Sequence, residues 1–225
     1  MCGRFTLSAS PRSIIEHFDI SGVDEFSTMA PRFNIAPSQE IPVVFKPDGD
    51  SERRLQPMRW GLVPHWTKDI NIGYKMINAR AETLAEKPAY RTPFKRHRCL
   101  IPADGYYEWK QLQGRKQPYY IHYPDGDVFG FAGLWEHWKG DKDEILSCSI
   151  ITTEADTRLG EIHKRMPVIL SKEHYDRWLD PNIQDTDTLT TMLATDTTSL
   201  EAYPVSTMVN NPKNQGAGLI IKQSE

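Results

Sequence analysis

Short runs of strand-forming residues, joined in pairs by turn sequences, occupy the middle of this 225-residue chain. The two clearest pairs are separated by Pro47-Asp48-Gly49 and by Gln113-Gly114. Apolar or alternating runs on either side of a glycine-containing turn are typical of a β-hairpin. We therefore expect two hairpins among a larger number of strands. The expected strands cover residues 41–45, 54–60, 106–110, 119–123, 128–135, 145–152, 168–170 and 219–221.

Helices are fewer than strands in this sequence. Ser10-Pro11 and the apolar spacing over residues 14–18 predict an N-capped amphipathic helix. We expect Ser171 to cap a second helix that carries Tyr175, Trp178 and Leu179, and residues 186–193 to form a third. Because strands outnumber helices and hairpins dominate, the sequence predicts an α+β fold with an antiparallel, barrel-like β core and flanking helices.

Length and composition exclude several classes of protein. At roughly 150 residues per domain, and without a repeat or a long linker, we expect residues 1–225 to form a single domain. No apolar run approaches the ~20 residues of a membrane span, and residues 1–4 lack the apolar part of a secretory signal. Cys2, Cys99 and Cys148 are too far apart for a disulfide framework, and the histidines lack metal-site spacing. We expect a monomer of the cytoplasm, nucleoid-associated if the host is bacterial, with no metal, cofactor, membrane contact or obligate protein partner.

Charge is unevenly distributed along the chain, although the net charge is only −3. Residues 178–212 contain no Lys or Arg, whereas residues 91–98 contain three Arg and one Lys. Such a cluster can form an electropositive site on an acidic protein, or simply a solvated helix face. Composition leaves both interpretations open.

Cys2 has the most distinctive chemistry in the sequence. Removal of Met1 would leave Cys2 with a thiol and a free α-amine on neighbouring carbons. The amine has a pKa of about 7.7–8.0 and the thiol about 8.5, so both can act as nucleophiles near neutral pH. A 1,2-aminothiol condenses with an aldehyde to an imine, which then closes to a thiazolidine. The alternative is a small buried residue near the start of a strand.

Four polar or charged residues have the chemical types that would assist such a reaction or bind its substrate. Asn78 and Arg80 lie two apart, so an extended strand presents both on one face, where they can bind an oxygen and a phosphate. Glu108 lies among aromatic residues, which favours a raised pKa and proton transfer. His163 lies in a loop before a strand, where catalytic groups often occur. A solvent-facing Glu and an ordinary surface His are the alternatives.

Aromatic residues suggest a nucleic-acid surface. Trp60 and Trp66 flank a segment with Gly and Pro, and exposed rings there could stack on bases, although core packing is the alternative. Arg4, Arg80 and the basic cluster at 91–98 would supply phosphate contacts.

Six segments, in order along the chain, together resemble one family. The chain is similar to the SOS response-associated peptidases, also called abasic site processing proteins, from residue 1 to about residue 215. The segments are MCGRF (1–5), RFNIAP (32–37), WGLVP (60–64), INARAE (77–82), RCLIPADGYYEW (98–109) and IHKRMPVIL (162–170).

The resemblance implies a DNA repair function in the SOS response: covalent trapping of abasic sites in single-stranded DNA. It implies that Cys2 is the nucleophile after loss of Met1, that Asn78 hydrogen-bonds the linkage, and that Glu108 assists proton transfer. It further implies that His163 helps to open the deoxyribose ring and that Arg80 binds phosphate. The residues that it places along the DNA channel, with less defined roles, are Arg4, Pro37, Trp60 and Trp66.

The chemistry of these residues and the resemblance both predict thiazolidine formation. An imine that undergoes β-elimination, instead of closing to the ring, would give a weak lyase activity. Two other functions remain open. Cys2 could act as the nucleophile of a thiol peptidase or amidohydrolase, of which removal of Met1 would be a minimal form. The basic and aromatic residues could also form a non-covalent single-strand binding module.

Overall fold

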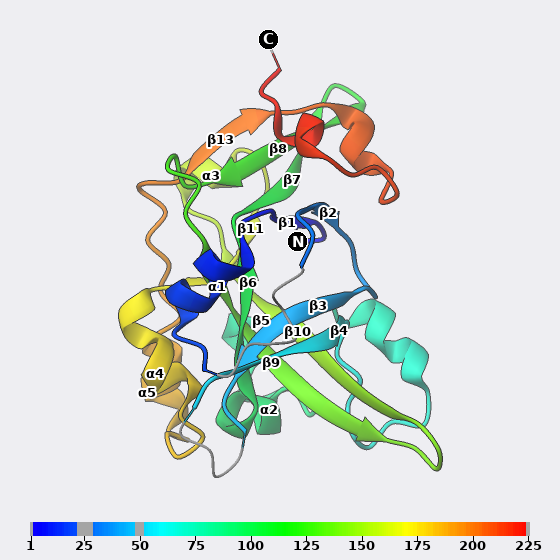
Figure 1. The fold of residues 1–225 in the computed structure, drawn as a ribbon, viewed down its shortest axis with the longest axis vertical. Coiled ribbons are helices and arrows are strands. Elements are labelled where there is room, and N and C mark those ends of the chain that lie inside the picture. Colours follow the sequence, from blue (N-terminus) through cyan, green and yellow to red (C-terminus); the bar gives the residue numbers. More distant parts are fainter. Residues whose placement is uncertain (1, 22–28, 48–51, 224–225) are drawn as a thin grey trace.

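The computed structural model describes residues 2–21, 29–47 and 52–223, and it contains two sheets (Figure 1). Five strands of the larger sheet close into a barrel, because β10 pairs with β4 on one side and with β9 on the other. The β10–β4 pair is parallel, and the four other pairs of the ring are antiparallel. The barrel strands are β3 (Glu40–Phe45), β4 (Arg54–Trp60), β6 (Arg98–Ala103), β9 (Phe129–Lys139) and β10 (Glu144–Glu154).

The smaller sheet lies above the barrel in Figure 1 and contains the first strand of the chain. Its strand order is β13-β8-β7-β1-β2, and all of its pairs are antiparallel. Asp104 alone separates β6 of the barrel from β7 of this sheet, so one run of chain connects the two. The strands are β1 (Phe5–Leu7), β2 (Arg32–Ile35), β7 (Gly105–Leu112), β8 (Arg115–His122) and β13 (Glu201–Pro204).

Short helices and strands complete the structure around the barrel. α1 and α4 lie along one side of it, and α2 lies at its lower end (Figure 1). The α-helices are α1 (Pro11–Phe18), α2 (Arg91–Arg96), α3 (Thr157–Gly160), α4 (Tyr175–Leu179) and α5 (Thr186–Thr191). The 3-10 helices are η1 (Ile70–Lys75), η2 (Ala81–Thr83), η3 (Lys172–His174), η4 (Thr207–Asn210) and η5 (Ala217–Ile220), and the remaining strands are β5 (Asn78–Arg80), β11 (Arg165–Pro167) and β12 (Ile169–Leu170).

Both predicted hairpins are confirmed, and with them the α+β fold with a barrel-like β core. β3 pairs with β4, and β7 pairs with β8. Gln113 and Gly114 have φ values of 30° and 86°, as a two-residue turn that matches strand twist requires. The predicted turn at residues 47–49 falls largely outside the described residues.

Two details of the prediction are wrong. The expected strand at 219–221 is instead the 3-10 helix η5, in which Leu219 is buried as a single apolar anchor. Ser171 precedes the 3-10 helix η3 and makes no side-chain cap bond; the expected helix begins only at Tyr175. The first helix is as expected, because the Ser10 side chain accepts a hydrogen bond from the Ser13 N–H.

A shared apolar core joins the sheets where β1 crosses the barrel. The ring of Phe5 packs edge-on against Trp60 at 5.2 Å and against Phe131 at 5.8 Å between centroids. All three side chains are fully buried, and each buried side chain of this size contributes about 1.5–3 kcal/mol. This packing fixes the position of the residues that precede β1. Among the described residues, no helix is long and apolar enough to cross a membrane.

Candidate active site at the N-terminal strand

The N-terminal strand is anchored by one buried carboxylate. Asp104 accepts hydrogen bonds from the Thr6 hydroxyl (2.5 Å), from the Ser8 hydroxyl (2.8 Å) and from the N–H groups of Ser8 (2.5 Å) and Ala9 (2.9 Å). Phe5 pairs with Tyr106 of β7 in the same region. These contacts hold β1 in register and thereby place Cys2 against the barrel.

Asn78 binds the backbone of Cys2. Its Nδ2 donates to the Cys2 carbonyl oxygen at 2.8 Å, and the Tyr90 hydroxyl donates to the Asn78 carbonyl at 3.2 Å. β5 holds Asn78 through its parallel pairing with Ile150 of β10. Oδ1 of Asn78 is buried and accepts no hydrogen bond from the described residues. One acceptor of this amide is therefore available to a bound ligand.

Glu108 and His163 lie side by side, and the Glu108 charge acts on the Cys2 thiol. Glu108 follows Tyr106 on β7 and is only 3 % exposed, whereas the His163 side chain is about one-third exposed (35 %). Oε2 of Glu108 lies 3.9 Å from Nδ1 of His163. The Arg165 N–H lies 3.1 Å from the same nitrogen, which fixes the ring. The pair thus connects a buried carboxylate to solvent.

Burial controls the titration of this site. It raises the pKa of the Glu108 carboxyl, while the positive charge of His163 acts in the opposite direction. It also raises the pKa of the fully buried Cys2 thiol, and the Glu108 charge adds to that rise. The sequence predicted a thiol near its ordinary pKa; the structure differs because the thiol is removed from water. Cys2 therefore needs a base to accept its proton, and Glu108 is beside it.

The structure separates the residues predicted to bind DNA. Trp66 is 55 % exposed, Arg80 is exposed and Pro37 is half-buried. Trp60, by contrast, is fully buried, and its Nε1 donates to the Ile77 carbonyl at 2.9 Å. The predicted stacking role of Trp60 is wrong, because its ring forms part of the barrel core.

Arg4 has a structural role in this chain. Its guanidinium donates to Oδ1 of Asn34 at 3.0 Å and to the Val209 carbonyl at 2.7 Å, which fastens the segment after β13 to β1 and β2. Asn34 adds three hydrogen bonds to carbonyls of the same segment, those of Val209, Asn211 and Asn214.

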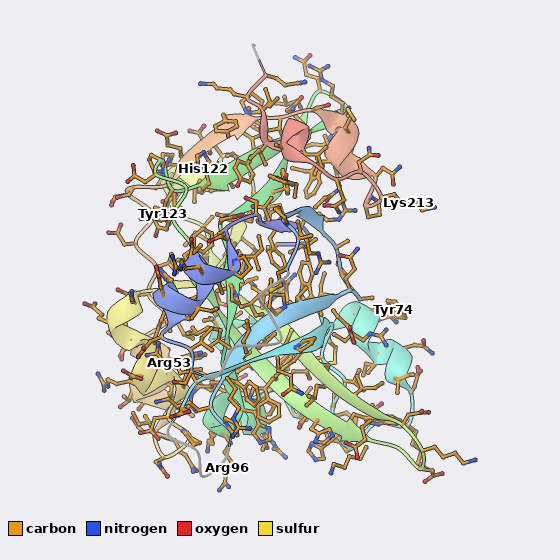
Figure 2. All side chains as sticks on the ribbon, in the orientation of Figure 1. Arg53, Tyr74, Arg96, His122, Tyr123 and Lys213 are labelled. Atoms are coloured by element: carbon orange, nitrogen blue, oxygen red, sulfur yellow. The ribbon has the colours of Figure 1, made fainter. Side chains whose placement is uncertain are left out.

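The basic cluster at residues 91–98 does not act as one phosphate-binding surface. Arg98 is 2 % exposed and donates to the backbone carbonyls of Phe94 and Lys95, as well as to those of Trp178 and Asp180. Figure 2 shows Arg96 at the lower end of the molecule, whereas β1 lies in its upper half. Arg98 therefore caps the C-terminal end of α2, and Arg96 faces solvent.

A second basic surface, which charge density along the sequence did not reveal, borders His163. An open hollow of about 630 Å³ is lined by Arg80, Lys164 and Arg165, together with two acidic residues, Glu154 and Asp156. Arg165 is engaged by Glu82 at 2.7 and 3.0 Å, so Arg80 and Lys164 are the cations left to meet a ligand. The string His163-Lys164-Arg165 was the only signal of Lys164 in the sequence.

Comparisons with known proteins show which family this chain resembles. The family model described as SOS response associated peptidase matches residues 1–212. The abasic site processing protein YoaM of Bacillus subtilis is 47 % identical over 223 residues, which cover 98 % of this chain and 97 % of that protein. The abasic site processing protein HMCES of Rattus norvegicus is 34 % identical and is matched over 82 % of this chain and 63 % of its own length.

A solved structure shares the fold. A protein from Bacteroides thetaiotaomicron superposes with a TM-score of 0.87 and 26 % identity, covering 99 % of this chain and all of the other. Because the family model spans nearly the whole chain and relatives of similar length reach 47 % identity, this protein belongs to the SOS response associated peptidase family.

Proposed function

We propose that this protein traps abasic sites in single-stranded DNA by a covalent bond to Cys2. The observation that carries the proposal is the convergence of four side chains at one place. Asn78 binds the Cys2 carbonyl, the Glu108 charge acts on the Cys2 thiol, and His163 lies 3.9 Å from Glu108. Relatives at 34–47 % identity are named abasic site processing proteins.

The first step joins the Cys2 amine to the lesion. After removal of Met1, the α-amine adds to the aldehyde carbon of the ring-opened abasic sugar. The carbinolamine loses its hydroxyl group as water and becomes an imine. His163, the partly exposed member of the pair, is placed to move the proton that opens the sugar ring.

The second step closes the ring. The Cys2 sulfur adds to the imine carbon, the thiol proton passes to Glu108, and the imine nitrogen takes up a proton to give a thiazolidine. A carboxylate with a raised pKa is a better base for a thiol whose own pKa is raised. Asn78 holds the Cys2 backbone, and its free Oδ1 can accept a hydrogen bond from the linkage nitrogen.

A denaturing gel tests the proposal. Wild-type protein, Cys2→Ala and an intact-DNA control are incubated with a single-stranded oligonucleotide that carries one abasic site. We expect a heat-resistant shifted band only with wild-type protein and abasic DNA. No band in a sample shown by mass to lack Met1 would overturn the proposal.

A thiol peptidase is the second candidate. It is favoured by two side chains that could accept the thiol proton, Glu108 and its neighbour His163. The complete burial of Cys2 limits its access to a folded protein substrate, so removal of Met1 from the same chain is the form of this activity that fits best. Turnover of a peptide added in trans, abolished in Cys2→Ala, would favour the peptidase instead.

A further inference from the structure

The segment between β4 and η1 presents an exposed tryptophan on a closed turn. The Thr67 N–H donates to the Pro64 carbonyl at 3.0 Å, so Pro64 to Thr67 form a β-turn with Trp66 at its third position. The Trp66 side chain is left 55 % exposed, although large aromatic side chains are usually well buried. We call residues 61–69 the Trp66 loop.

We propose that Ser147, Glu136 and Trp138 of the β9–β10 hairpin are positioning residues that hold the Trp66 loop as a stacking platform for a base of single-stranded DNA. This inference rests on the proposed function for its ligand. It concerns residues that make none of the contacts of the Cys2 site.

Alternate residues of the Trp66 loop are tied to the hairpin. The Val63 N–H donates to the Ser147 hydroxyl at 2.8 Å, and Nδ1 of His65 lies 2.9 Å from Oε2 of Glu136. Two residues further along, the Thr67 carbonyl accepts from Nε1 of Trp138 at 2.9 Å. Residues 63, 65 and 67 therefore face the hairpin, and Trp66 between them is turned to solvent.

The three hairpin residues share one face. Ser147 and Glu136 are cross-strand partners, and Trp138 lies two residues from Glu136, so all three side chains project from the same side. β9 and β10 extend as a long arm beyond the other barrel strands (Figure 1). Side chains on one face of this arm bind residues 63, 65 and 67 of the loop. Two segments far apart in the sequence thus meet through three hydrogen bonds that involve hairpin side chains.

Glu136 is an unusual residue to bury unless it has such a role. It is 4 % exposed, and Oε1 lies 3.6 Å from Nδ1 of His97 while Oε2 meets His65. Burial acts to raise the pKa of Glu136, but the neighbouring His97 ring and the hydrogen bond with His65 outweigh it, and the net shift is downward. The carboxylate is thus ionised at neutral pH and forms a charge-assisted bond to the loop.

A double-mutant cycle on DNA affinity tests the inference. Binding of a fluorescent, undamaged single-stranded oligonucleotide is measured for Glu136→Gln and Trp138→Phe, each with Trp66 present and in the Trp66→Ala chain. Trp66→Ala should weaken binding about 5- to 150-fold, the range that ~1–3 kcal/mol of base stacking gives. We expect each positioning variant to weaken binding by about 3- to 10-fold with Trp66 present and by less than about 2-fold without it, because positional effects of this kind are coupled.

His137→Gln is the matched control, because His137 lies between the two positions on β9 and pairs with Glu144 on the opposite face. It should leave affinity unchanged. Trp138→Phe keeps an aromatic ring and removes the Nε1 donor with part of the indole, so it remains informative if Glu136→Gln lowers the Tm. Equal losses in both backgrounds, no loss in either, or an unchanged affinity of Trp66→Ala would overturn the inference.

The crosslinking assay separates this inference from the proposed function. At saturating abasic oligonucleotide, both positioning variants should reach the wild-type rate of crosslinking, with only the half-saturating concentration raised. A lowered maximal rate would contradict a role through Trp66. Absence of crosslinking in wild-type protein would instead overturn the proposed function and leave the affinity cycle interpretable.

Discussion

Proton control is the central property of the Cys2 site at the scale of single residues. Burial keeps the thiol protonated, so the α-amine is the group better suited to make the first bond. In the mechanism that we propose, Glu108 accepts the thiol proton, which requires its carboxyl to be ionised before the ring closes. The same burial that makes Glu108 a strong base makes its charge costly.

Replacing Glu108 with Gln tests this balance. In the wild-type chain, the pKa of Glu108 in the folded state lies above the unfolded value of about 4.3, so the folded chain binds this proton more tightly. The free energy of unfolding therefore falls as pH rises from the unfolded pKa through the folded pKa. Above this window Glu108→Gln should raise the Tm by about 2–4 °C, the shift that ~1 kcal/mol gives at this length. Crosslinking should slow by about 10²- to 10⁴-fold.

Thermal melts and single-turnover crosslinking at pH 7.5 and near pH 4 measure both effects. Most of the stability gain should be lost at the lower pH, where the wild-type carboxyl is largely protonated in both the folded and the unfolded chain. A variant that is less stable at pH 7.5, or one that crosslinks at the wild-type rate, would show that Glu108 is not a buried base.

Asn78 offers a second test at the residue scale. Asn78→Asp keeps the size of the side chain but loses the donor to the Cys2 carbonyl and places a negative charge against that carbonyl oxygen. We expect the crosslinking rate to fall at least about 10-fold, since removing one buried hydrogen-bond partner costs ~1–3 kcal/mol. Affinity for undamaged single-stranded DNA should be unchanged. A loss of affinity equal to the loss of rate would assign Asn78 to DNA binding.

At the scale of elements, turn chemistry predicted more than apolar content did. Gln113-Gly114 located the β7–β8 hairpin because few dipeptides accept positive φ at both positions. The prediction of a strand at residues 219–221 was wrong because a run of three apolar residues fits a short 3-10 helix with one buried side chain as well as it fits a strand. Trp60 and Trp66 are indistinguishable in sequence, and only the closure of the barrel buries the first and not the second.

The two tryptophans should therefore respond oppositely to truncation. Trp60→Ala should lower the free energy of unfolding by about 3–5 kcal/mol, because it leaves a cavity beside Phe5 and removes the bond to Ile77. Trp66→Ala should change it by no more than about 0.5 kcal/mol, as an exposed surface substitution does. Urea unfolding of the pair measures both. A large destabilisation by Trp66→Ala would place that ring in the core.

The whole molecule has a net charge of −3 and yet is expected to bind a polyanion. Basic side chains near the site, not the overall charge, have to supply the attraction. The convergence of residues 2, 78, 108 and 163 could not be read from spacing, because it depends on β1 and β7 pairing while β5 joins β10. Before the structure, these four positions were predicted to form one site from the resemblance to the family, and not from the periodicity of the sequence.

Salt dependence tests the location of the basic surface. Each phosphate contact on single-stranded DNA contributes about 0.7 to the slope of log K against log salt concentration. Arg80→Gln and Lys164→Gln should each reduce the slope by about that amount, because both line the hollow beside His163. Arg96→Gln on α2 is the control and should leave the slope unchanged. An effect of Arg96 equal to that of Arg80 would move the DNA path to the lower end of the barrel.

Intact mass of the crosslinked species tests the covalent mechanism most directly. After incubation with an oligonucleotide that carries one abasic site, we expect one adduct whose mass is that of the chain without Met1 plus the oligonucleotide minus one water. Peptide mapping should place the added mass on Cys2, and Cys2→Ser should give no heat-stable adduct, because a hydroxyl cannot close the thiazolidine. An adduct that retains Met1, or one that maps to any residue other than Cys2, would contradict the account.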